Sequence, residues 1–255
     1  MLTPSGRKPL RKPRRPILLG LCLSLTAVAW QSEPPRHQPP AADGRFVSYR
    51  ADPRRLALYW HDEHGQPLRS LGRLRGWLAG QQKTLVFATN GGMYRAGNAP
   101  VGLFIQAGKV VTPLDTAAGT GNFYLRPNGV FYLTADGRAA VCRTQDFRPS
   151  GRIRYATQSG PMLVIDGRIH PAFQPGSKNL NVRNGVGLLP DGRVLLAMSK
   201  QPVSFYEFAR YFQQQGCRQA LYLDGFVSRT YLPAAGWRQT DGDFGVIIGV
   251  TAAGR

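Results

Sequence analysis

Four short stretches place a polar side chain beside a glycine at one end of an apolar run. They are Asn90-Gly91, Ser159-Gly160, Arg183-Asn184 and Asp224-Gly225. A carboxylate can serve as a base or a nucleophile, and a guanidinium presents a planar fork of donors that matches a phosphate. Taken singly, each stretch also fits a plainer interpretation. Asn-Gly and Asp-Gly are common turns, and a lone arginine is usually a solvated surface residue.

The other acids and the histidine have structural explanations in the sequence. The Asp-Gly-Arg sequences that begin at 136, 166 and 191 are hairpin signals. Glu207 stands three residues after Ser204, which predicts a helix capping box. His170 comes two residues after a hairpin turn, and it fits either a surface residue or a proton donor.

Serine-nucleophile and zinc chemistry are not indicated. No G-x-S-x-G sequence surrounds Ser159, and no cluster of Cys and His has zinc-site spacing. We therefore expect no cofactor, although a divalent cation, if one binds, would take oxygen ligands from Asp224 and Asn90. Cys142 and Cys217 can either form a disulfide or lie apart as core residues.

Strand signals dominate the chain. Runs rich in β-branched and aromatic residues lie at 45–51, 55–62, 84–90, 101–108, 109–114, 122–127, 129–135 and 138–144. Pro-Asn-Gly at 127–129 is a further hairpin signal. Two helices are expected, at 70–82 and 204–216, because apolar residues recur there on one side. These elements predict a strand-rich α+β single domain with a mixed or antiparallel sheet and a few packed helices.

The N-terminal segment has the pattern of an export signal. Residues 1–16 carry six positive charges and no acid, and an apolar run at 17–29 ends in Ala-Val-Ala. The run is shorter than the ~20 residues that span a bilayer, so we expect a signal peptide at 1–29, with an uncleaved anchor as the alternative. A Pro-rich disordered linker at 30–44 then precedes a domain at 45–255. The predicted location is periplasmic or secreted, without stable membrane insertion after cleavage.

The charge suggests anionic partners but not nucleic acid. The formal net charge is +19, and the arginines outside the leader are scattered among strands and turns. Nucleic-acid binding would favour a continuous basic face with interleaved aromatics. Phosphorylated sugars or anionic envelope glycans are the expected partners, and the sequence does not indicate an oligomeric state.

Taken in order, the four stretches resemble the phosphodiester glycosidase (uncovering enzyme, NAGPA-like) family, in its small exported bacterial branch. The similarity spans about 85–232 and is carried by four segments, "NGGMY", "SGPMLVIDG", "RNGVGLLPDGRVLLAMS" and "SFYEFARYFQQQGCRQALYLDG". Better-known members have Asp-Gly-Gly-Gly-Ser-Ser where this chain has "DGFVSR" at 224–229. Bulky residues here replace the small, flexible residues of those members, so the resemblance does not imply a particular substrate.

The resemblance implies hydrolysis of a sugar 1-phosphodiester at the sugar–phosphate bond. Because a phosphate monoester leaves without much help from an acid, one carboxylate can suffice. Asp224 would then be the catalytic carboxylate, or orient the sugar hydroxyls, and Arg183 would hold the phosphate. Substrate would also contact the remaining residues of the four stretches, Asn90, Gly91, Ser159, Gly160, Asn184 and Gly225. The alternative is a glycan- or envelope-binding domain of the same fold that has no turnover.

Overall fold

Short strands make up most of the described elements, as the sequence pattern predicts. The computed structural model describes residues 1–2 and 43–253. The predicted leader and linker therefore lie outside the described residues, apart from 1–2 and 43–44. The described domain falls within one compact unit, Pro39–Arg255. None of the helices in the described part is long and apolar enough to span a bilayer.

A six-stranded sheet carries two of the four predicted stretches, Arg183-Asn184 and Asp224-Gly225. Its strand order is β1-β14-β13-β15-β11-β12, and every pairing is antiparallel. The strands are β1 (Phe46–Ala51), β11 (Met162–Ile165), β12 (Arg168–Ile169), β13 (Asn184–Leu188), β14 (Val194–Ser199) and β15 (Ala220–Asp224). The central β15 is a buried apolar run, and it ends at the carboxylate of Asp224.

Two five-stranded antiparallel sheets pack beside the first. A separate two-stranded ribbon lies between them along the chain. The second sheet has the order β7-β6-β10-β8-β9, and the third has the order β17-β16-β3-β18-β2. The second is built from β6 (Phe104–Gln106), β7 (Lys109–Thr112), β8 (Gly129–Thr134), β9 (Ala139–Arg143) and β10 (Ile153–Ser159). The third is built from β2 (Leu56–Tyr59), β3 (Lys83–Asn90), β16 (Thr230–Leu232), β17 (Trp237–Arg238) and β18 (Ile247–Ala253). The ribbon pairs β4 (Tyr94–Arg95) with β5 (Ala99–Pro100).

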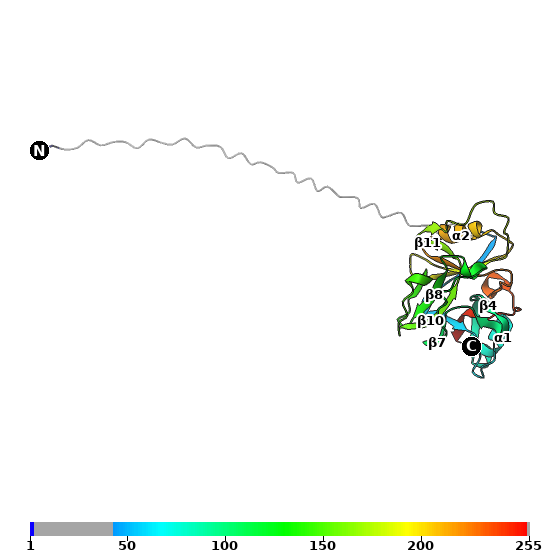
Figure 1. Ribbon diagram of the computed structural model, residues 1–255. Helices are drawn as coiled ribbons and strands as arrows, with labels where there is room; N and C mark the ends of the chain where they lie inside the picture. The colour runs from blue at the N-terminus through cyan, green and yellow to red at the C-terminus, as the bar shows by residue number, and fades with distance from the viewer. Residues whose placement is uncertain (3–42, 254–255) are drawn as a thin grey trace. The chain divides into compact units, whose positions relative to one another are not determined.

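Both predicted helices are confirmed, and so is the capping box predicted for the second. Helix α1 (Leu71–Gly80) is capped by Ser70 and buries its three leucines. Helix α2 (Phe205–Gln214) has the predicted capping box, in which Ser204 and Glu207 exchange side-chain and backbone hydrogen bonds. Glu207 is thus committed to the helix start. In Figure 1 the two helices lie at opposite ends of the domain, with the strands between them.

The core consists of apolar clusters that lie between the sheets and under the two helices. The largest apolar cluster joins all three sheets through residues such as Phe87, Phe131 and Leu221. A second cluster fills the space between α2 and the outer face of the six-stranded sheet. A third packs α1 against the third sheet. The strand-rich α+β fold class predicted from the sequence is therefore confirmed.

Two local predictions are wrong. Residues 122–127 do not form a strand, because Asn122–Tyr124 is a short 3-10 helix that buries Phe123. The Pro-Asn-Gly sequence does not join two paired strands. Its buried Asn128 donates a side-chain hydrogen bond to the Phe123 carbonyl and leads directly into β8. The Asp-Gly-Arg hairpins are confirmed, and Asp166 and Gly167 adopt positive φ values of 51° and 83°.

Candidate functional site

Asp224 ends β15 at an irregularity in the sheet. The pairing of β13 with β15 shifts register between Asn184 and Gly185, which places Asp224 opposite Asn184. The carboxylate is partly exposed. Its Oδ1 accepts a hydrogen bond of 2.7 Å from the Gly225 N–H, and its Oδ2 accepts one of 3.3 Å from Asn90 Nδ2. Burial raises the pKa of Asp224 to about 6, although both hydrogen bonds favour the ionised form.

The turn after Asp224 requires glycine because of a close contact. A Cβ on Gly225 would lie 2.5 Å from the Tyr222 hydroxyl, which is closer than such atoms approach. Ser228 closes the turn, since its backbone N–H donates to the Gly225 carbonyl at 2.8 Å and its hydroxyl donates to the same oxygen. The Asp-Gly pair is therefore a packed corner, and its geometry does not depend on a positive φ.

Two buried asparagines join this corner to the third sheet. Asn90 and Asn184 are both fully buried, at 0% exposure. Asn184 Nδ2 donates to the Asn90 backbone carbonyl at 2.6 Å and to Thr89 Oγ1 at 3.0 Å. Asn90 Oδ1 accepts from the Arg229 N–H at 3.1 Å and also from Asn184. Asn90 therefore turns its N–H₂ group toward Asp224, and the pair does not present two oxygen ligands to a cation.

Ser159 and Gly160 support the same corner from the second sheet. The buried Ser159 hydroxyl donates to the Leu223 carbonyl at 2.8 Å, just before Asp224. Gly160 lies so close to Asn128 that a Cβ would approach its side chain to 2.6 Å. Gly91 is also tightly packed, because a Cβ there would meet Ile248 at 2.8 Å. In the described arrangement these residues shape and brace the corner.

Arg183 lies under the corner and does not face it across an open hollow. Its side chain is fully buried, at 0% exposure, with the guanidinium carbon 3.6 Å from the centre of the Phe205 ring. The guanidinium donates to the Val203 carbonyl at 2.9 Å and to the backbone and side-chain oxygens of Asn179 at 2.9 and 3.0 Å. Because no part of it reaches solvent, direct phosphate binding would require residues around it to move.

The Tyr222 hydroxyl connects this buried cation to the corner. Arg183 Nη1 lies 3.4 Å from the hydroxyl oxygen, and the same hydroxyl packs against Gly225. Burial lowers the pKa of Arg183, and among the described residues no carboxylate forms an ion pair with it. An uncompensated buried cation is costly, which makes structural residues of this kind unusual.

Two further groups, Tyr94 and Asp243, had no signal in the motif pattern. Burial raises the pKa of Tyr94, and the negative charges of Asp224 and Asp243 raise it further. Asp243 is hydrogen-bonded to Arg69 at 2.7 Å and to Asn98 at 2.8 Å, and both bonds lower its pKa. Tyr94 therefore lies within electrostatic reach of two carboxylates whose pKa values are shifted in opposite directions.

The remaining candidates have internal partners. The side chain of His170 is buried, with Nδ1 accepting from the Ala172 N–H at 3.1 Å and Nε2 3.0 Å from the Arg126 carbonyl. The surface interpretation of this histidine is thus wrong, and neither ring nitrogen is open to a substrate. Cys142 and Cys217 are not bridged. Burial raises their pKa values to about 11 and about 12, respectively, so both are poorly reactive thiols.

No group of three or more His, Cys, Asp or Glu side chains that could hold a metal occurs in the part of the chain that the structure describes. What the corner offers is one carboxylate whose pKa is raised to about 6 and which accepts hydrogen bonds from Asn90 at the end of β3 and from Gly225 in the turn after β15. Such a group can accept a proton or attack an electrophilic carbon at neutral pH.

Comparison with known proteins gives a consistent family. The family model described as "Phosphodiester glycosidase" matches residues 83–250. The uncharacterized protein YigE of Escherichia coli (strain K12) is 37% identical over 190 residues, which are 72% of this chain and 73% of that protein.

Two solved structures share the fold at low sequence identity. One is the catalytic domain of zebrafish N-acetylglucosamine-1-phosphodiester alpha-N-acetylglucosaminidase, auto-inhibited by its pro-peptide. It has a TM-score of 0.55 at 14% identity and covers 83% of this chain and 85% of its own. The other, from Burkholderia pseudomallei K96243, has a TM-score of 0.52 at 13% identity and covers 80% and 73% of the two chains.

Proposed function

We propose, from the premise that this chain belongs to the phosphodiester glycosidase family, that it hydrolyses a sugar 1-phosphodiester at the sugar–phosphate bond. The observation that carries the proposal is the environment of Asp224. This carboxylate lies in a packed corner, and its pKa is raised to about 6. At neutral pH most of this group is ionised, so it can act as the base or the nucleophile.

The single carboxylate suits the leaving group of this reaction. Ordinary glycosidases use two carboxyl groups because a departing alcohol needs a proton. A phosphate monoester has a second pKa of ~6 and leaves without one. Asn90 Nδ2 and the Gly225 N–H hold Asp224 in place, so that one carboxylate oxygen of a preorganised group meets the sugar carbon.

Arg183 enters the proposal as a positioning residue. Its guanidinium donates to neutral groups on three sides and contacts the Tyr222 hydroxyl, which packs on Gly225. The cation therefore fixes Tyr222, and through it the turn that sets the direction of Asp224. The substrate phosphate would be bound by a more accessible arginine of the same turn, Arg229, whose side chain pairs with Asp241 at 2.8 Å.

The primary test is turnover of diesters, beginning with diesters of N-acetylglucosamine 1-phosphate because the zebrafish neighbour is named for them. Asp224→Asn should lower kcat/KM about a thousandfold, within the range for loss of a base or nucleophile. Asp191→Asn, at a hairpin whose aspartate pairs with Arg193, is the matched control and should retain activity. In ¹⁸O-water the released phosphate ester should contain no ¹⁸O, because the oxygen of water joins the sugar.

The alternative is a binding domain without turnover, and one observation favours it. Phe226, which directly follows Gly225, is 85% exposed. An aromatic ring at such a position can stack on a sugar face without any catalysis. Diesters that bind wild type and Asp224→Asn equally, with no product from either, would establish this alternative and exclude the hydrolase.

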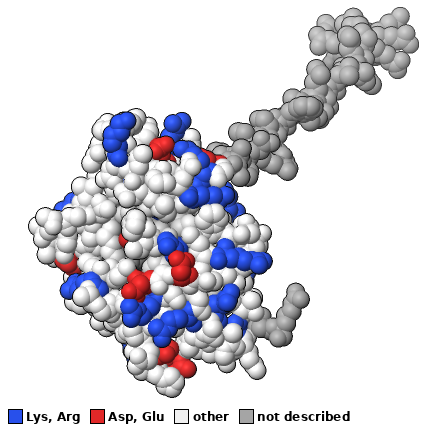
Figure 2. Space-filling view, turned by 90° about the vertical axis from the view of Figure 1, so that its right-hand side faces the viewer, with Lys and Arg blue, Asp and Glu red and all other residues white. Residues whose placement is uncertain are grey.

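We also propose that the protein is exported and acts on phosphorylated sugars or envelope glycans in the periplasm or outside the cell. The proposal rests on the basic leader and short apolar run at 1–29. Figure 2 shows Lys and Arg side chains interspersed with uncharged and acidic residues on the face in view, which does not favour nucleic acid as a partner. N-terminal sequencing of the mature protein should begin at Trp30, and a sequence beginning at Met1 would contradict cleavage.

A further inference from the structure

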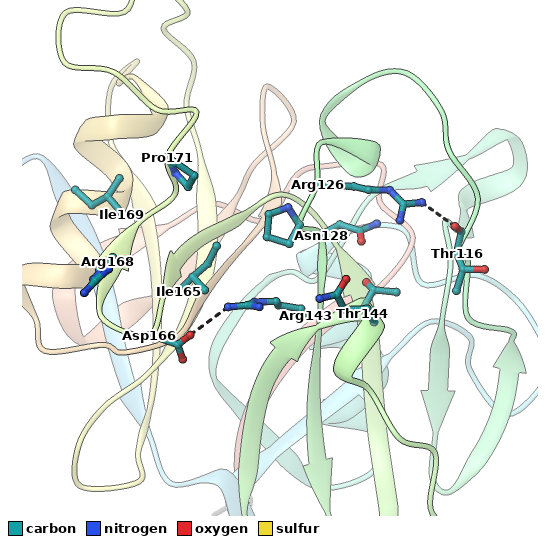
Figure 3. Close-up of a pocket in the computed structure, with 12 residues that line it drawn as sticks. Thr116, Arg126, Asn128, Arg143, Thr144, Ile165, Asp166, Arg168, Ile169 and Pro171 are labelled. Atoms are coloured by element: carbon teal, nitrogen blue, oxygen red, sulfur yellow. Dashed lines mark hydrogen bonds and ion pairs between the residues drawn. The ribbon is translucent and has the colours of Figure 1, made fainter.

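A large cleft lies between the β11–β12 hairpin and the end of β9 (Figure 3). Its volume is about 810 Å³, within the ~300–1,000 Å³ typical of small-ligand sites. None of the residues that contact Asp224 lines it. Three arginines do line it, and they come from three separate segments: Arg126, Arg143 and Arg168.

The cleft is positively charged because its arginines outnumber its acids. The only acidic residue that lines it is Asp166, which pairs with Arg143 at 3.2 Å. Arg126 uses Nη2 for the carbonyls of Thr116 and Ala117, which leaves Nε and Nη1 as donors. In Figure 3, Arg143 extends toward Asp166 and Arg126 turns toward Thr116 on the opposite side.

Comparison with two matched hairpins explains why Arg168 is available. The chain contains Asp-Gly-Arg at 136–138, 166–168 and 191–193. In the first and third, the arginine pairs with its own aspartate at 2.6 Å. In the second, Asp166 instead contacts Arg143 and accepts a 2.7 Å hydrogen bond from Gln219. As a result, the Arg168 side chain makes no hydrogen bond or ion pair with the described residues.

The residues that line the walls of the cleft indicate what the ligand carries besides its phosphate groups. Ile165 and Ile169 contribute apolar surface, as do Pro127 and Pro171, and no aromatic residue lines the site. Nucleotide bases are usually bound by stacking on aromatic rings, so a nucleotide is disfavoured. A saccharide has apolar C–H faces that suit aliphatic walls, and its phosphate groups suit arginine forks.

The cleft and the Asp224 corner lie at opposite ends of one strand. Gln219, which contacts Asp166, immediately precedes β15, and Asp224 ends it. Five residues of extended chain separate their Cα atoms by ~16 Å. A ligand in the cleft therefore need not touch Asp224, and its binding can be tested without turnover.

We propose that this cleft is a second binding site, which holds a phosphorylated saccharide through Arg126, Arg143 and Arg168. Asp166 limits the site, because its carboxylate competes with the ligand for Arg143. The site does not depend on the proposed hydrolysis. It would hold either a free sugar phosphate or one phosphorylated unit of a longer glycan.

The test is calorimetric titration of the purified chain at about 50 mM salt, where exposed charges are little screened. The probes are fructose 1,6-bisphosphate, glucose 6-phosphate, inorganic phosphate, uridine monophosphate and a phosphorylated oligosaccharide. The bisphosphate should bind at least tenfold more tightly than glucose 6-phosphate, and uridine monophosphate no better than inorganic phosphate. Tighter binding of the oligosaccharide would identify a polymer as the source, and equal binding a free sugar phosphate.

Variants assign the binding to the cleft. Arg168→Gln should weaken the bisphosphate about tenfold, as loss of a charge-assisted contact predicts. Arg138→Gln, the same change in the matched hairpin, should have no effect. Asp166→Asn should strengthen binding several-fold, because Arg143 loses its competing partner. Asp224→Asn should bind like wild type, which separates this proposal from the hydrolase.

Several outcomes would overturn the proposal. These are an absence of saturable binding by any probe, equal effects of Arg168→Gln and Arg138→Gln, loss of binding in Asp224→Asn, or a preference for uridine monophosphate. Circular dichroism and thermal unfolding of each variant would show that weaker binding does not reflect loss of the fold.

Discussion

The Asp224 corner and the arginine cleft hold their charged groups in opposite ways. At the corner, one carboxylate and the nearby Arg183 are surrounded by neutral hydrogen-bonding groups, and burial shifts both pKa values toward the uncharged form. In the cleft, three arginines reach solvent, and the one ion pair is exposed, with side-chain exposures of 36% and 60%.

The two arrangements suit different tasks: the corner suits a reactive carboxylate, and the cleft suits the attraction of an anion. A group that titrates near neutrality must be taken partly out of water, which the fold achieves with buried strands and the asparagine pair. An anion-binding surface needs charges that stay solvated until the ligand arrives, and exposed loops and hairpins suffice for that. Stability should therefore be sensitive to charge changes at the corner and insensitive to those in the cleft.

The largest expected effect is the loss of protein stability when Arg183 is replaced. Arg183→Ala removes the donors of the Val203 and Asn179 oxygens and leaves a cavity beside Phe205. We expect a loss of about 3–4 kcal/mol in the free energy of unfolding. Arg168→Ala in the cleft should change it by less than about 0.5 kcal/mol. Urea unfolding of the two variants measures both values, and similar small losses would remove the contrast.

The next effect is the pH dependence of stability at Asp224. The folded-state pKa of about 6 lies above the ordinary value of 3.8, so the folded protein holds more protons between these pH values. Wild type should therefore lose stability as pH rises from 4 to 6, whereas Asp224→Asn lacks this dependence. The stability of the variant relative to wild type should rise by about 2 kcal/mol between pH 4 and pH 8, less than the full shift because the group is partly exposed. A constant difference across pH would refute the shift.

A third effect concerns the pH profile of turnover. If Asp224 acts as base or nucleophile, kcat/KM should fall about tenfold per pH unit below a midpoint near 6, the pKa of Asp224. A fall above pH 6 would instead assign Asp224 as an acid. Initial rates with the best diester, over about pH 4 to 8, give the profile. Asp191→Asn is again the control and should keep the same midpoint.

The smallest effect is expected at the Arg143–Asp166 ion pair. Because both side chains are substantially exposed, Arg143→Gln should alter the free energy of unfolding by no more than about 0.5 kcal/mol. Any change should vanish at about 0.5 M NaCl, since salt screens exposed charges. The loss caused by Arg183→Ala should persist at the same salt concentration. A large, salt-resistant effect at Arg143 would show that the cleft shares the buried character of the corner.

Much of the fold could be predicted from local patterns. The helix at 204–216 combined an apolar stripe with a capping box, and both signals depend on residues close in sequence. The failure at 122–127 has the same origin, because a short apolar run cannot distinguish a strand from a 3-10 turn that buries one phenylalanine. Pro-Asn-Gly failed because Asn128 has a tertiary partner, Phe123.

The candidate site was harder to predict because its electrostatics depend on distant segments. The sequence analysis grouped Asn90 and Asn184 with Asp224 in one site, and in the structure the two asparagines lie next to Asp224. The burial of Arg183 could not be foreseen, since it depends on a ring at Phe205 and oxygens at 179 and 203. The cleft had no sequence signal, because its three arginines converge only when the second and first sheets pack together.

The position of β18 has a consequence for how the protein is made. This strand, Ile247–Ala253, lies between β3 and β2 and pairs with residues up to about 190 positions earlier. The third sheet therefore cannot close until this late segment has been synthesised. Because these pairings are far apart in the sequence, the domain can complete its folding only after nearly all of the chain has been made.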